Sequence, residues 1–137
     1  MKNLWPTIDK GYNSPPIDIL KKQGEYLEGI SNKVLTYDID TGVFEEAKWS
    51  KSGKALKSNF YIHAPYLDDY KYLLLYVIHD FLDLYPIHIG AFQKEQEVIP
   101  TANNKEEFEK MIAEILGSKK TQHIINTLYT RSQVQPA

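Results

Sequence analysis

The sequence predicts a single α+β domain over residues 1–137, built from an antiparallel meander of four or five strands, one N-terminal helix and two C-terminal helices. Three observations lead to this fold class. Residues 60–92 are dense in aromatic and β-branched side chains, which is the composition of strands in a sheet. Helical hydrophobic periodicity appears on either side of this stretch. A chain of 137 residues fits one domain with one hydrophobic core.

The N-terminal part predicts an arm followed by a helix. Residues 1–13 lack periodicity and are expected to form an extended arm that lies on the domain surface. Its apolar side chains are Leu4, Trp5 and Ile8. A helix is expected over residues 16–29, with Ser14 as the N-cap and proline in the first turn. The apolar residues at helical spacing are Ile17, Leu20, Leu27 and Ile30.

From Lys33 the pattern changes to that of strands. Residues 33–40 and 43–49 are rich in strand formers, and they predict either a hairpin or one bent strand. Asp40-Thr41-Gly42 between them is interpreted as a solvated turn. The same tripeptide matches the core of the aspartic-protease signature, but it lacks the apolar approach that this motif needs. The segment 49–55 is polar and predicts an exposed loop.

The central stretch predicts three strands, at 57–67, 71–80 and 85–92. Turns are expected at Asp68-Asp69 and near residues 80–83, since aspartate favours turns. A helix through residues 71–82 is the rival interpretation, because apolar residues there also fall on one helical face. If the strand forms, residues 72–78 are apolar on both faces and predict a central strand that is covered on both sides.

The C-terminal part predicts two helices. The first begins after Asn103 or Asn104, which supply an N-cap, and it ends at Gly117. Its apolar stripe consists of Phe108, Met111, Ile112, Ile115 and Leu116. The second begins at Lys119 or Lys120, and residues 132–137 are expected to form a frayed tail.

Composition narrows the function classes. The chain has no cysteine, which removes disulfides, thiolate nucleophiles and cysteine metal sites. The net charge is −2, so nucleic acid is an unfavoured partner. No apolar run has the length of a membrane span, and residues 1–16 do not resemble a signal peptide. We therefore expect a soluble, cytoplasmic protein with no membrane partner, no cofactor and no metal site.

Histidines in the predicted sheet are the candidates for chemistry, because imidazole acts as a base or a metal ligand near neutral pH. A turn centred near Asp69 would place Tyr61, His63 and His79 on one face, with His63 opposite Leu75 and His79 opposite Asn59. At that separation the two imidazoles do not bind one metal. The sequence does not determine whether His88 shares this face.

The leading functional hypothesis is a non-enzymatic interaction module that binds a protein partner or self-associates, because aromatic and acidic residues concentrate in one segment without a convergent catalytic set. The proposed binding residues are Tyr61, His63, Tyr66, Asp68, Asp69, Tyr70 and His79. The alternative is a small hydrolase or ligand-binding protein with a histidine-lined pocket. A third possibility, stacking of nucleic-acid bases on the tyrosines, lacks the interleaved cations that hold phosphates.

Overall fold

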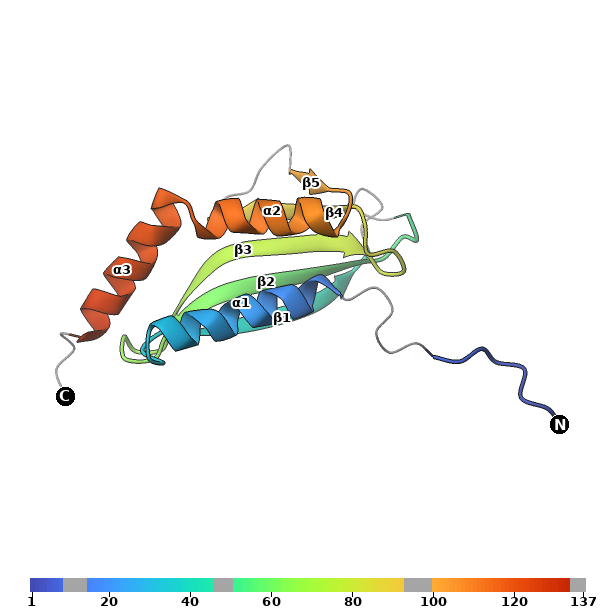
Figure 1. Ribbon diagram of the computed structural model, residues 1–137, viewed down its shortest axis with the longest axis horizontal. Helices are drawn as coiled ribbons and strands as arrows, with labels where there is room; N and C mark the ends of the chain where they lie inside the picture. Colours follow the sequence, from blue (N-terminus) through green and yellow to red (C-terminus); the bar gives the residue numbers. More distant parts are fainter. Residues whose placement is uncertain (9–14, 46–50, 93–99, 134–137) are drawn as a thin grey trace.

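The computed structural model describes residues 1–8, 15–45, 51–92 and 100–133. The elements in chain order are α1 (Pro16–Ile30), β1 (Thr36–Phe44), β2 (Ala55–Ala64), β3 (Tyr70–Asp80), β4 (Ile87–Ala91), β5 (Thr101–Ala102), α2 (Lys105–Leu116) and α3 (Lys119–Gln133) (Figure 1). The strands form one sheet in the order β1-β2-β3-β4-β5, and every neighbouring pair is antiparallel. The predicted α+β meander with one N-terminal and two C-terminal helices is confirmed.

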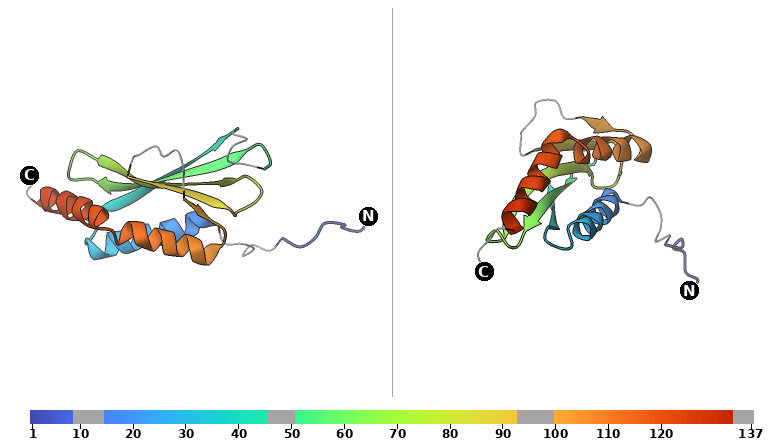
Figure 2. Two further views of the ribbon diagram at one scale, coloured as in Figure 1. Left: turned by 90° about the horizontal axis from the view of Figure 1, so that it is seen from above. Right: turned by 60° about the vertical axis from the view of Figure 1, so that its left-hand side comes forward.

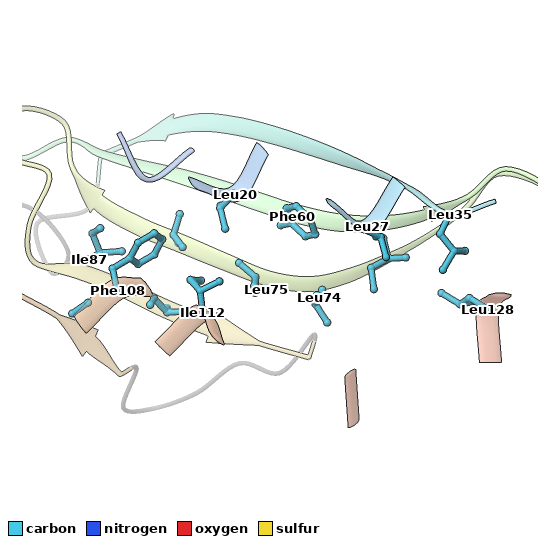
Figure 3. Close-up of a cluster of buried hydrophobic side chains, with 14 of the residues drawn as sticks. Leu20, Leu27, Leu35, Phe60, Leu74, Leu75, Ile87, Phe108, Ile112 and Leu128 are labelled. Carbon is cyan, nitrogen blue, oxygen red and sulfur yellow. The ribbon is translucent and has the colours of Figure 1, made fainter. Parts of the chain in front are cut away.

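All three helices lie on one side of the sheet, and no helix in the described ranges covers the other side (Figure 2). The hydrophobic core fills the space between the helices and the sheet (Figure 3). Its best buried side chains come from every layer: Leu20 of α1, Ile62 of β2, Leu75 of β3, Ile89 of β4 and Phe108 of α2. One face of the sheet therefore packs against the core, and the other face carries the side chains that are candidates for binding.

The register of β2 and β3 decides which side chains reach each face. The turn between them covers residues 65–69, so Ala64 pairs with Tyr70. Further along, the register shifts between Phe60 and Tyr61, and this irregularity leaves Leu74 without a direct partner on β2. The extra residue changes the parity of β3, so that Leu74 and Leu75 both join the core.

This register corrects the expected histidine geometry. His63 pairs with Lys71 rather than Leu75, and His79 pairs with Leu56 rather than Asn59. His79 therefore lies on the helix side of the sheet, whereas Tyr61 and His63 lie on the other side. The prediction that these three side chains share one face is wrong, because it contained no register shift. The predicted turn also lay two residues too late, which changed the pairing partners but not the faces.

The Asp40-Thr41-Gly42 segment is a second correction, because it lies within β1 rather than in a turn. Its three residues pair with Asn59, Ser58 and Lys57 of β2, and the Thr41 and Ser58 hydroxyl oxygens are 3.0 Å apart. Cross-strand pairing has outweighed the turn preference of the three residue types. The single-strand alternative is the one observed, and residues 46–49 lie outside the described residues.

The strand interpretation of residues 71–80 is confirmed, because β3 pairs with β2 on one side and β4 on the other. β3 is the middle strand, as its apolar sequence predicts. On the side without helices its last residues are still buried, with Tyr76 and Ile78 packed against Ala55. Gly90 of β4 leaves room for the Tyr76 ring, which a Cβ at that position would overlap.

The two ends of the chain depart from their predictions. Leu4, Trp5 and Ile8 are each more than 80% exposed, so the apolar residues of the arm do not lie on the domain surface as expected. Figure 1 shows residues 1–8 extending away from the sheet and helices. At the other end, α3 continues through Ser132 and Gln133, which were assigned to the frayed tail. Residues 9–14, including the expected N-cap Ser14, and residues 134–137 lie outside the described residues.

The predicted N-cap of the first C-terminal helix is confirmed. The Asn104 side chain accepts a hydrogen bond from the Glu107 amide at 2.9 Å, and Glu107 Oε1 in turn accepts from the Asn103 amide at 3.1 Å. After the helix ends at Gly117, the buried Thr121 hydroxyl donates to the Ile115 carbonyl at 2.6 Å. The first two bonds cap the start of α2, and the third ties the start of α3 to the end of α2.

Close packing of α1 on β1 provides the first test. A Cβ at Gly24 would overlap the Tyr37 ring, whereas a Cβ at Gly29 of the same helix would meet no atom. We expect Gly24→Ala to lower the free energy of unfolding by about 1–3 kcal/mol, because overpacking outweighs the better helix propensity of alanine. Gly29→Ala is the matched control and should raise stability by up to about 1 kcal/mol. Urea unfolding of both variants measures this, and equal stabilisation by the two alanines would contradict the tight packing.

Candidate functional site

The candidate site is a set of polar side chains on the side of the sheet that the helices leave open. We call it the helix-free face, and it consists of Thr36, Asp38, Asp40, Asn59, Tyr61, His63 and Lys71. Strand pairing brings these residues together: Asp38 is opposite Tyr61, Asp40 is opposite Asn59, and His63 lies between Thr36 and Lys71. Directly opposed side chains in an antiparallel pair point to the same side of the sheet. The face is therefore polar over β1 and β2, and on β3 it passes from Lys71 to the apolar Leu73, which is opposite Tyr61.

An ion pair crosses the face from β1 to β3. Lys71 Nζ donates to Asp38 Oδ2 at 2.7 Å, and both side chains are close to half exposed. The hydrogen bond from Lys71 lowers the pKa of Asp38 below its ordinary value, and the hydrogen bond to Asp38 raises the pKa of Lys71. Because β2 lies between the two strands, this bond spans the row that carries Tyr61. The ion pair holds the Lys71 and Asp38 side chains in place without burying either charge.

Tyr61 is the aromatic centre of the helix-free face. Partial burial raises the pKa of its phenol, and the negative charge of Asp40 raises it further. Asp40 also accepts a hydrogen bond from Asn59 Nδ2 at 2.8 Å. The tyrosine ring therefore has a fixed polar neighbour on β1, while the phenol remains protonated at neutral pH.

Three side chains at the end of the face form a hydrogen-bonded chain. The distance from Thr36 Oγ1 to His63 Nδ1 is 3.0 Å, and the distance from His63 Nε2 to Asp69 Oδ1 is also 3.0 Å. Donation of the Nε2 proton to Asp69 leaves Nδ1 to accept from the Thr36 hydroxyl. This order of hydroxyl, imidazole and carboxylate is the one used to activate a nucleophile. However, the Asp69 side chain is 78% exposed, so water screens the carboxylate that would have to stabilise an imidazolium.

The turn between β2 and β3 holds three of the predicted site residues, Tyr66, Asp68 and Asp69, and Tyr70 follows as the first residue of β3. Asp68 and Asp69 adopt φ values of 56° and 54°, in the left-handed region that aspartate tolerates better than most residues. Asp69 reaches back to His63, so the structure brings these two predicted residues together. Asp68, Tyr66 and Tyr70 are exposed beside them. Tyr70 pairs with Ala64, whose side chain lies in the core, and so it projects from the helix side of the sheet.

The other two histidines of the sheet lie apart from this group. His79 is 7% exposed on the helix side, and its Nδ1 donates to the Asp80 carbonyl at 2.8 Å. His88 is opposite Ile78, about 23 Å along β3 from the position opposite His63. Its Nδ1 lies 3.1 Å from Thr101 Oγ1, and burial lowers the pKa of its imidazole. The three histidines therefore lie apart from one another, and His79 is buried on the helix side of the sheet.

The described ranges contain no group of three or more histidine, aspartate or glutamate side chains placed to hold a metal ion. Three cavities lie on the helix side, and they are lined by residues of α1, α2, α3 and the core side of the sheet. No helix in the described part of the chain combines the length and apolarity needed to cross a bilayer.

Sequence reasoning missed Thr36, Asp38, Asp40, Asn59 and Lys71. A signal for most of them was present, because polar residues alternate at positions 36, 38 and 40 and again at 59, 61 and 63. A polar period of two marks the solvated side of a strand. Assigning Asp40-Thr41-Gly42 to a turn interrupted the first of these two rows. The pairing of Asp38 with Lys71 depends on the register and had no signal in either segment alone.

The ion pair gives a pH prediction. Lys71→Met should raise the pKa of Asp38 toward its ordinary value, because the hydrogen bond that favours the carboxylate is lost. Since the folded-state pKa is the lowered one, the wild-type stabilisation is present above the unfolded-state pKa of about 3.9 and is lost as pH falls through the folded value. Carbon-detected NMR titration of Asp38 measures the shift. Lys57→Met is the control, because Lys57 Nζ lies over the Tyr76 ring; an equal shift in both variants would contradict a specific pair.

No family model, curated protein or solved structure matches this chain.

Proposed function

We propose that this protein is a non-enzymatic interaction module that binds a partner protein through its helix-free face. The observation that carries the proposal is the ordered polar surface around Tyr61, in which Lys71 holds Asp38 and Asn59 holds Asp40. Side chains that are already held in one geometry lose less conformational entropy when a partner binds. A partly buried tyrosine at the centre of such a surface supplies contact area and a polar tip.

The electrostatics of the face indicate the chemistry of the partner. Asp38 is neutralised by Lys71, whereas the hydrogen-bonding neighbours of Asp40 are the uncharged side chains of Asn59 and Tyr61. The exposed Asp69 adds a further negative charge beside His63. A partner surface with an arginine or lysine facing Asp40 would complement this pattern and would associate faster at low salt. The expected partner is therefore a protein with a basic patch around an apolar centre.

The exposed carboxylate of Asp69 makes binding the better use of the Thr36, His63 and Asp69 chain. In the serine-protease arrangement the carboxylate is buried and the hydroxyl stands beside a substrate pocket. Here the carboxylate is open to solvent, and the three cavities described above lie on the opposite side of the sheet. Cytoplasmic location and the absence of nucleic-acid partners stay predictions from composition.

Affinity capture followed by titration calorimetry, for the dissociation constant, and surface plasmon resonance, for the association rate, tests the proposal. A protein captured by the wild-type chain is purified and titrated against Tyr61→Ala and Asp40→Asn. We expect Tyr61→Ala to raise the dissociation constant by about tenfold or more, since truncation of a central aromatic residue commonly costs more than about 1 kcal/mol of binding free energy. Asp40→Asn should reduce mainly the association rate and its dependence on salt.

The control is Tyr129→Ala, which removes a partly exposed tyrosine from α3 on the helix side. It should leave the dissociation constant unchanged. Tyr66→Ala measures any contribution of the turn. The proposal fails if a captured partner binds all the sheet variants as tightly as the wild type.

A further inference from the structure

An open groove runs between α1 and α2 on the helix side of the sheet. Two cavities that share Gln23 and Leu116 lie along it. One, of about 430 Å³, is bordered by charged side chains that include Lys22, Lys105 and Glu109. The other, of about 190 Å³, is apolar. Together they form a groove with a polar half near the start of α1 and an apolar half near its end.

The apolar half reaches down to the core. Its lining includes Leu27 and Ile30 of α1, Phe60 and Leu74 of the sheet, Leu116 of α2 and Ile125 of α3. The rim is also apolar, because Tyr26 is 54% exposed and Ile30 is 80% exposed. Exposed apolar side chains around an opening into a core are a feature of docking sites. The space suits a large aromatic side chain more than an extended polar segment.

The same chain carries a segment that fits this description. The arm, residues 1–8, exposes Leu4, Trp5 and Ile8 by 82%, 85% and 82%. Clustered apolar side chains gain free energy when they leave water, and an indole ring has the largest apolar area to bury. In the single chain these side chains remain in solvent while the groove remains open. The backbone of residues 1–8 extends away from the helices and the sheet (Figure 1). In a second copy, the arm finds an open groove and the groove finds an apolar arm.

We propose that the arm of one copy docks into the groove between α1 and α2 of a second copy, with Trp5 in the apolar half. Reciprocal exchange of two arms closes a two-fold dimer, in which each chain gives one arm and receives one. The second contact forms within an existing complex, so two modest contacts produce a stable pair. The helix-free face stays open in such a dimer, because the groove is on the opposite side of the sheet.

Sedimentation equilibrium of the full chain tests the proposal. We expect the wild type to dimerise, and we expect Trp5→Ser and Ile30→Glu each to weaken dimerisation at least tenfold. Leu82→Glu is the matched control, because Leu82 is 78% exposed in the loop after β3 and lines neither half of the groove. Circular dichroism and the thermal midpoint establish that each variant is folded.

Mixing the arm variant with the groove variant distinguishes this dimer from dimers formed by other contacts. The Ile30→Glu chain keeps an intact arm, and the Trp5→Ser chain keeps an intact groove. The mixture should therefore associate more tightly than either variant alone, though less tightly than the wild type. A mixture no tighter than its components, or a Trp5→Ser chain that dimerises like the wild type, would overturn the proposal.

Labelling with 5-fluorotryptophan reports where Trp5 lies, with its ¹⁹F resonance assigned from Trp5→Ser. The resonance should shift with protein concentration in parallel with dimerisation. A monomer in which the resonance is already shifted at every concentration would place the arm in its own groove and overturn exchange. A monomer with a solvent-exposed Trp5 at every concentration would overturn docking altogether.

Discussion

The pairing of β2 with β3 is the constraint on which the rest of the structure depends. These strands supply much of the sheet side of the core, and their register decides which of their side chains face the helices. The shift near Phe60 and Tyr61 turns Leu74 and Leu75 both inward, so the middle of β3 supplies two consecutive leucines to the core. Past the shift, His79 lies on the buried side, whereas Lys71 on the near side of the shift stays on the solvated side beside His63. A single extra residue thus separates a core histidine from a surface histidine.

The elements that sequence predicts well are those in which a local pattern and the tertiary environment agree. Asn104 caps α2 because asparagine can satisfy a free amide at a helix start, and Phe108 and Ile112 then follow on the buried face. β3 is central because its residues are apolar at both parities. Asp40-Thr41-Gly42 was predicted incorrectly as a turn, since turn preference is a local property whereas strand pairing depends on a distant segment. Pairing with Asn59, Ser58 and Lys57 of β2 decided the conformation there.

The candidate site was predicted in part. Tyr61, His63 and Asp69 lie together, because a short turn brings the ends of two strands back beside each other. Asp38 comes from β1, and its contact with Lys71 joins positions 33 residues apart through the register of two strand pairs. An error of one residue in either register moves a side chain to the other face. A site that draws on three strands therefore cannot be assembled from local patterns, although the strands that carry it can.

The two sides of the sheet divide the interactions of this chain according to what each side exposes. The helix-free face offers hydrogen-bonded charges and one tyrosine, which favours a partner recognised by complementary polar groups. The groove offers apolar side chains that continue into the core, and an occupant there is held by burial rather than by charge. Salt should therefore weaken contacts on the first side and have little effect on the second. This difference follows from the meander itself, because helices that cover only one side of a sheet leave the other side to be solvated.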